Sequence, residues 1–91
     1  MATVINEYPL SDPRTVVNMP YDGSVLTVEV LDGVPTLCSR ENASSQKSDR
    51  VFVIFASDQA IGDGSLSYVG SFQLPAGTAY HVFEGDPAPI E

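Results

Sequence analysis

Apolar and polar residues alternate along most of this chain, and this period of two limits its fold more than any other feature. The apolar positions are dominated by β-branched and aromatic side chains, and no segment repeats apolar residues at helical spacing. Seven Pro and seven Gly are spread over the 91 residues, so almost any helix of three turns would contain a breaker. We therefore expect an all-β fold, a small antiparallel sandwich or partly open barrel of about six to seven strands.

Turn residues divide the chain into its expected strands. A single β domain is expected over residues 1–84, because a chain of this length has room for one core. Residues 85–91 lack periodicity and contain two prolines, so we expect a C-terminal tail there. The expected strands are Val4–Tyr8, Arg14–Asn18, Ser24–Leu31, Val34–Ser39, Arg50–Ala56, Ser67–Leu74 and Thr78–Glu84.

Two hairpins and one central strand are the clearest local predictions. Asp32-Gly33 stands between two apolar runs, which suits a type I′ turn with positive φ at both residues. Residues 74–78 carry the Pro and Gly of a second tight turn. The segment Val51–Phe55 is apolar at every position, so both faces of that strand should be covered.

Hydropathy also predicts which residues face the core and which form loops. Within residues 24–31, strict alternation places Leu26, Val28 and Val30 together on one buried face. Residues 39–49 are polar and almost without apolar anchors, so we expect a mobile, exposed loop there.

The chain is acidic, with a net charge of −8, and its charges are unevenly placed. Three of the four cationic residues lie within residues 40–50, whereas residues 51–91 contain five acids and no base. Such a surface repels a phosphate backbone, so direct nucleic-acid binding is not expected. It suits a basic protein surface, including one that normally holds nucleic acid, although the same charge also keeps a small protein soluble.

The sequence carries no signal for a membrane or for export. No apolar run approaches the roughly 18 residues of a membrane span, so no membrane partner is expected. The first seven residues lack the basic end and apolar stretch of a secretory signal. These features predict a cytoplasmic protein, in the cytoplasm of the host cell if a phage encodes it.

Residues suited to catalysis or metal binding are scarce. Cys38 is the single cysteine and cannot form an intramolecular disulfide, and with one histidine, His81, the sequence offers no close-spaced set of zinc ligands. Alternation places His81 on the same strand face as Phe83, and the sequence indicates no activated nucleophile beside it. The segment Gly62-Asp63-Gly64 lacks the ligands of an EF-hand and the Lys of a phosphate loop, which indicates a turn. We expect no enzyme, no cofactor and no metal site.

Several short motifs resemble a known family when they are taken in order. They are Asp32-Gly33-Val34-Pro35, Tyr68-Val69-Gly70-Ser71-Phe72-Gln73 and His81-Val82-Phe83-Glu84. Their order and spacing over about residues 5–84 resemble a family of small, uncharacterised bacterial and bacteriophage domains. Members often carry Gly-Thr-Gly-His after the central strand, where this chain has Phe55-Ala56-Ser57-Asp58-Gln59, so no ligand role of that segment is carried over. The resemblance implies a phage or prophage accessory protein and assigns no activity.

The expected function is binding, and three hypotheses follow. The first is an inhibitor that occupies a host or anti-phage defence protein through an acidic surface of about 800 Å². The second is a virion structural or decoration component, and the third is a sponge for a small signalling nucleotide. A homo-oligomer, most simply a homodimer, would cover open strand edges in each case. The residues expected to contact a partner are Arg40, Lys47, Arg50, Asp58, Asp63, Tyr68, Tyr80 and His81.

Overall fold

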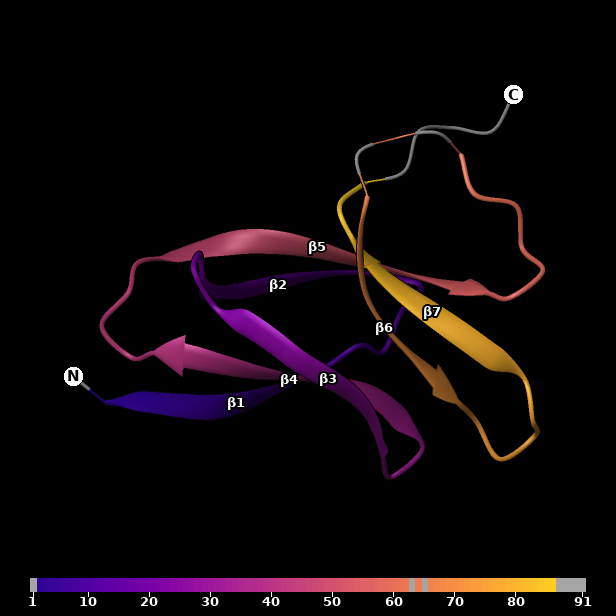
Figure 1. Ribbon diagram of the computed structural model, residues 1–91, viewed down its shortest axis with the longest axis horizontal. Helices are drawn as coiled ribbons and strands as arrows, with labels where there is room; N and C mark the ends of the chain where they lie inside the picture. Colours follow the sequence, from indigo (N-terminus) through magenta and orange to yellow (C-terminus); the bar gives the residue numbers. More distant parts are fainter. Residues whose placement is uncertain (1, 63, 65, 87–91) are drawn as a thin grey trace.

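The chain forms two antiparallel sheets that face each other, as the computed structural model shows for residues 2–62, 64 and 66–86 (Figure 1). One sheet has the strand order β1-β4-β3 and the other β2-β5-β7-β6. The sheets do not close into a barrel, so the all-β prediction is confirmed in its sandwich form. None of the described residues belongs to a helix that could cross a membrane. The strands are β1 (Thr3–Pro9), β2 (Arg14–Pro20), β3 (Ser24–Leu31), β4 (Val34–Asn42), β5 (Lys47–Ala56), β6 (Ser67–Gln73) and β7 (Ala79–Glu84).

Both predicted hairpins are present. Asp32 and Gly33 join β3 to β4 with φ values of 51° and 79°, the positive values that a type I′ turn requires and that Gly adopts without strain. The second hairpin joins β6 to β7, where the Gly77 N–H donates to the Leu74 carbonyl at 2.8 Å. Turn chemistry therefore fixed these two strand pairs locally.

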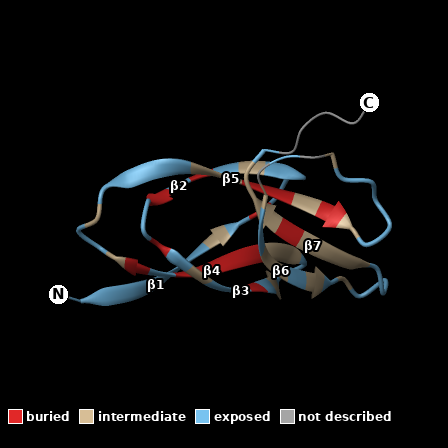
Figure 2. Cartoon of the chain, turned by 45° about the horizontal axis from the view of Figure 1, so that its top comes forward, coloured by how far each residue is buried: buried red, intermediate tan, exposed pale blue. Residues whose placement is uncertain are grey.

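Strand β5 is an inner strand of the four-stranded sheet, with β2 on one side and β7 on the other. Its apolar segment is covered on both faces, since Phe52, Val53 and Phe55 are all buried. Figure 2 shows the buried stretches on the strands around this interior, whereas β1 is exposed almost throughout. The main core cluster consists of Leu10, Val17, Met19, Val28, Leu37, Phe52 and Val82.

A bulge in β3 overturns the predicted alternation of that strand. Val25 pairs with Ser39 and Thr27 pairs with Cys38, so Leu26 is an extra residue in the ladder. The bulge moves Leu26 to the surface, where it is 54% exposed, and turns Val25 toward the core. Val28 stays buried as predicted. The prediction for Leu26 was wrong because a strict alternation of inward and outward residues assumes that the strand contains no bulge.

The predicted mobile loop over residues 39–49 is also wrong. Strand β4 continues to Asn42 and β5 starts at Lys47, so only residues 43–46 connect them. The cause is a polar interior: Ser39 and Glu41 alternate with outward-facing residues but are 0% and 3% exposed. Polar side chains that face inward have the hydropathy of a loop, and the sequence pattern could not distinguish the two.

Glu41 is held inside by side chains of β1. The Asn6 amide and the Tyr8 hydroxyl each donate to its Oε1 atom at 2.8 Å, while Oε2 has no hydrogen-bond partner among the described residues. Burial raises the pKa of Tyr8 to about 12, and the hydrogen bond to Glu41 and the charge of Glu41 add to the increase. These bonds fasten the edge strand β1 to the interior.

The two sheets approach most closely where β6 passes β3. A methyl group added at Gly70 would lie 3.3 Å from Cγ2 of Val28, which leaves little room for a larger residue. Gly70 also follows the bulge in β6, between Tyr68 and Gly70 in the pairing with β7. The absence of a side chain thus allows β6 to cover the buried Val28.

The expected tail begins with two described residues that contact the sheet. The Gly85 N–H donates to the Val51 carbonyl at 2.8 Å, and Asp86 forms a bidentate ion pair with Arg14. The hydrogen bonds from Arg14 lower the pKa of the Asp86 carboxyl. Residues 87–91 lie outside the described part of the chain.

The bulge predicts opposite outcomes for the same substitution at two leucines. Leu37→Ala should lower the free energy of unfolding by about 2–5 kcal/mol, because Leu37 is fully buried and the change leaves a cavity. Leu26→Ala should change it by no more than about 0.5 kcal/mol, as at other exposed sites. Urea unfolding of both variants measures the difference, and an equal loss from both would contradict the bulged register.

The raised pKa of Tyr8 predicts a loss of stability at alkaline pH. The unfolded phenol ionises near its ordinary pKa of about 10, but the folded one ionises only near pH 12. The native state therefore retains a proton that the unfolded state releases, and stability falls as pH rises from 10 through 12. Tyr8→Phe should remove this late titration from the ultraviolet absorbance of the tyrosines, at a cost of about 1.5 kcal/mol at neutral pH. The matched control Tyr21→Phe, at a 65% exposed position, should leave it in place.

Candidate functional site

The residues expected to contact a partner do not form one site. Tyr68 and His81 lie together on the outer face of the four-stranded sheet. Tyr80 lies on the opposite face of β7, and its ring stacks on the ring of Phe72, with the centroids 5.3 Å apart and 14° between the planes. Asp58 is exposed in the segment after β5, and Asp63 lies outside the described residues.

His81 contacts two hydroxyl groups. Its Nε2 atom lies 3.1 Å from Oγ of Ser57, and its Nδ1 atom lies 3.2 Å from the hydroxyl of Tyr68. Oγ of Ser57 also donates to the Ala79 carbonyl at 3.2 Å. A serine beside a histidine is a pair that the sequence pattern missed, because 24 residues separate them.

One tautomer satisfies all three of these contacts. The Tyr68 hydroxyl donates to Nδ1, the Nε2–H of His81 donates to Ser57, and Ser57 donates to the Ala79 carbonyl. In this arrangement the imidazole donates to Ser57 and does not accept its proton, so Ser57 is not activated as a nucleophile. The network is better suited to fixing the exposed ring of Tyr68, which also meets Phe83 edge-on at 5.3 Å.

The cationic candidates differ in how far they are available to a partner. Arg50 is engaged internally: Nε and Nη2 donate to Glu84 at 2.7 Å, and Nη1 donates to the Gly23 carbonyl at 2.8 Å. The hydrogen bonds to Glu84 raise the pKa of Arg50 despite its burial, and the charges of Glu84 and Glu41 raise it further. Arg40 and Lys47 are exposed, so they are the cations left for an external phosphate or carboxylate.

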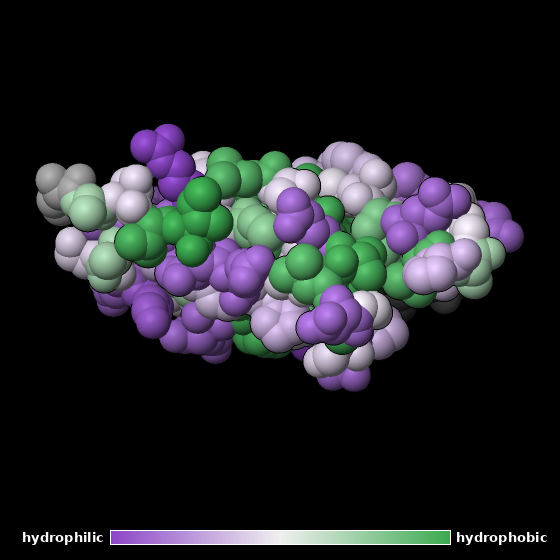
Figure 3. All heavy atoms as spheres, turned by 90° about the horizontal axis from the view of Figure 1, so that it is seen from below, coloured by the Kyte–Doolittle hydropathy of each residue, from purple (hydrophilic) through white to green (hydrophobic). Residues whose placement is uncertain are grey.

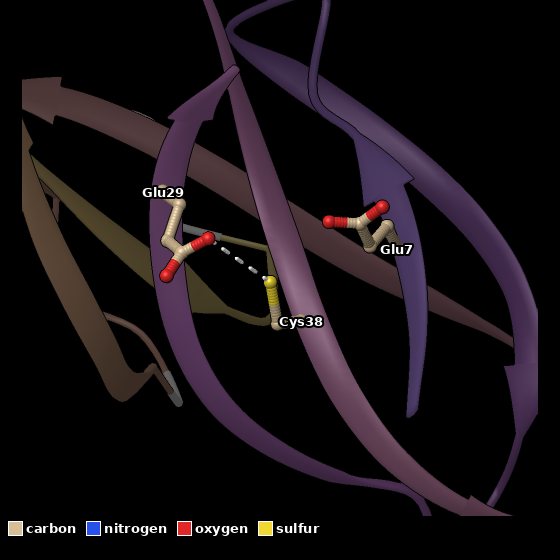
Figure 4. A group of neighbouring side chains, drawn as sticks. All are labelled: Glu7, Glu29 and Cys38. Atoms are coloured by element: carbon tan, nitrogen blue, oxygen red, sulfur yellow. Dashed lines mark hydrogen bonds between the residues drawn. The ribbon is translucent and has the colours of Figure 1, made fainter. Parts of the chain in front are cut away.

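Three potential metal ligands meet on the outer face of the three-stranded sheet (Figure 4). Glu7 on β1, Cys38 on β4 and Glu29 on β3 place ligand atoms within 4.8 Å of one another. They come from three separate strands, so only the strand register could have revealed the group. Burial raises the pKa of the Cys38 thiol, and the neighbouring charges of Glu29 and Glu7 raise it further.

The raised pKa favours the protonated thiol in this group. Sγ of Cys38 donates to Oε2 of Glu29 at 3.9 Å, a weak hydrogen bond that needs the thiol proton. A metal ion would have to displace that proton before the sulfur could bind it. Cys38 therefore serves as a small buried side chain whose thiol donates one weak hydrogen bond, to Glu29.

An open pocket of about 370 Å³ lies at one end of the sandwich. It is formed where the connection from β1 to β2, the end of β5 and the β6–β7 hairpin meet. No motif predicted it, since its lining comes from five separate segments of the chain. The pocket is lined by Leu10, Ser11, Asp12, Pro13, Pro35, Ile54, Ala56, Gln59, Phe72, Leu74 and Tyr80.

Exposed apolar side chains are spread over the surface outside this pocket. Figure 3 shows one face of the molecule, on which separate hydrophobic areas are divided by hydrophilic residues. The exposed residues come from different strands and connections: Val4, Ile5, Val16, Tyr21, Leu26, Leu31, Ile61 and Tyr68. The pocket gathers apolar residues into one concave site, whereas these exposed side chains stay scattered.

Comparison with known proteins places the chain in a family without assigning it an activity. No curated protein and no solved structure matches it. One family model, a domain of unknown function (DUF7352), matches residues 1–90 and confirms the family resemblance. The chain with its two-sheet sandwich, open pocket and acidic composition belongs to this family, DUF7352.

Proposed function

We propose that this protein acts by binding a basic surface of another protein and carries out no covalent chemistry. In the phage or prophage setting that we propose for it, the partner is a host or anti-phage defence protein, and binding inhibits it. The observation that carries this proposal is the placement of charge on the folded chain.

Two of the four cations are neutralised by the fold itself. Arg14 pairs with Asp86, and Arg50 pairs with Glu84. The other two, Arg40 near the end of β4 and Lys47 at the start of β5, flank the β4–β5 connection at the left of Figure 1. The opposite end of the molecule therefore lacks a free cation among the described residues.

That opposite end carries exposed carboxylates. Asp12 precedes β2, Asp32 lies in the β3–β4 turn and Asp58 follows β5. None of the three forms an ion pair with a described residue. We call Asp12, Asp32 and Asp58 the acidic end. Unpaired carboxylates at the same end of a molecule attract a basic surface and speed its association, and they repel nucleic acid.

A virion structural or decoration component is the second candidate. Its support is the open edges of both sheets, since β1 and β2 each have one pairing partner. Ile5 and Val16 on these edge strands are 62% and 48% exposed, as residues that join copies of a chain would be. A homo-oligomer built through these edges stays a prediction, which the mass in light scattering would test.

The binding proposal predicts a local effect of charge. The variant Asp12→Asn, Asp32→Asn, Asp58→Asn should lose a partner that the wild type captures from a lysate of phage-infected bacteria, as identified by mass spectrometry. The matched variant Glu7→Gln, Asp22→Asn, Asp49→Asn should retain it. Each variant removes three acids from a chain of net charge −8, so both have the same net charge.

The two triple variants distinguish a specific surface from general acidity. Retention by the matched variant alone, with capture weakened by added salt, supports the proposal. Equal loss from both variants would mean that net charge causes the capture, and no enrichment by the wild type at low or moderate salt would overturn the proposal. Purified virions that contain the chain would favour the structural candidate.

A further inference from the structure

We infer that the pocket beside the acidic end is the anchor site for the partner, and that it takes an aromatic side chain from a basic segment of that protein. This inference rests on the proposed function and deepens it, since it names the group that is bound and the place where it binds. The walls, the rim and the rigidity of the pocket each support it.

The walls of the pocket present flat apolar surfaces. Phe72 and Tyr80 stack with their planes 14° apart, and Pro13 and Pro35 add two rings from other segments. Aromatic side chains are the commonest anchors of protein interfaces, and they fill concave apolar pockets of this kind. A volume of about 370 Å³ lies toward the lower end of the roughly 300–1,000 Å³ that small-molecule sites span.

The polar groups at the rim favour a cation beside the bound ring. Asp12 lines the pocket, Asp58 adjoins the lining residue Gln59, and Asp32 stands three residues before the lining Pro35. Oε1 of Gln59 already accepts the Ala56 N–H at 3.2 Å. The lining thus offers one carboxylate, that of Asp12, and two more carboxylates lie close in the chain to other lining residues, but few polar groups converge on a ligand. This combination suits a side chain flanked by Lys or Arg better than a polar metabolite.

Backbone hydrogen bonds hold the walls in place without a ligand. The Leu10 N–H donates to the Pro35 carbonyl, and the Ile54 N–H donates to the Pro13 carbonyl, both at 2.8 Å. These bonds tie the connection between β1 and β2 to both sheets at the mouth of the pocket. A preformed pocket spares the entropy of ordering its walls on binding, which favours its use as an anchor site.

The inference can be tested with short peptides because the chain contains no Trp. The probes are acetyl-Lys-Trp-Lys-amide, acetyl-Glu-Trp-Glu-amide and acetyl-Lys-Ala-Lys-amide, each added to the wild-type protein. The emission of the peptide Trp should shift to the blue with the Lys-flanked peptide, which should bind at least about tenfold more tightly than the Glu-flanked one. An excess of the Ala peptide should not displace it. Equal binding of the two Trp peptides would overturn the cationic requirement, and no shift with either would overturn the anchor site.

Variants then locate the binding. Ala56→Phe fills the pocket and should weaken the Lys-Trp-Lys peptide at least about tenfold. Val16→Phe adds the same ring at a 48% exposed position outside the pocket and should leave the binding of this peptide unchanged. If Ala56→Phe fails to fold, Asp12→Asn replaces it and should reduce the preference for the Lys-flanked peptide. Tight binding of the Lys-Trp-Lys peptide that neither Ala56→Phe nor Asp12→Asn changes would mean that the peptide binds elsewhere. Loss of peptide binding alongside intact, charge-dependent capture of a protein would refute the anchor but leave the proposed function standing.

Discussion

The contact between the inner faces of the two sheets is the interaction on which the rest of the structure depends. Leu37 on the three-stranded sheet and Phe52 and Val82 on the four-stranded one are all 0% exposed. These side chains lie between the two sheets, so each sheet needs the other to remove them from water. Because a small chain has one such layer, its polar and open features are placed at the ends.

The two ends of this interior differ in chemistry. At one end, buried Glu41 accepts from Asn6 and Tyr8, and Arg50 is bound by Glu84 and by backbone carbonyls. Buried charges of this kind add little net stability, but a shift of register would leave them unpaired, so they specify one arrangement of the strands. At the other end the interior is mostly apolar and open, and no charged network among the described residues closes it.

The sequence predicted those features that depend on neighbours along the chain. Turn residues and apolar alternation located all seven strands, and the uniform apolar run Val51–Phe55 was recognised as the central strand. Features that depend on pairing across strands were not predicted. The bulge at Leu26, the inward-facing Glu41 and the internal use of Arg50 each follow from a register that no local pattern contains.

Charge and shape contribute to different parts of a binding event, so the acidic end and the pocket can serve the same partner. In the proposed binding, long-range attraction to Asp12, Asp32 and Asp58 would raise the rate of encounter but give little specificity, and salt would screen it. A ring buried among Phe72, Tyr80 and the prolines would instead slow dissociation, which is where most differences in affinity arise. The two features meet at Asp12, a carboxylate that also lines the pocket. A partner that matches both must present its aromatic residue within a basic segment, and this requirement excludes most acidic or neutral proteins.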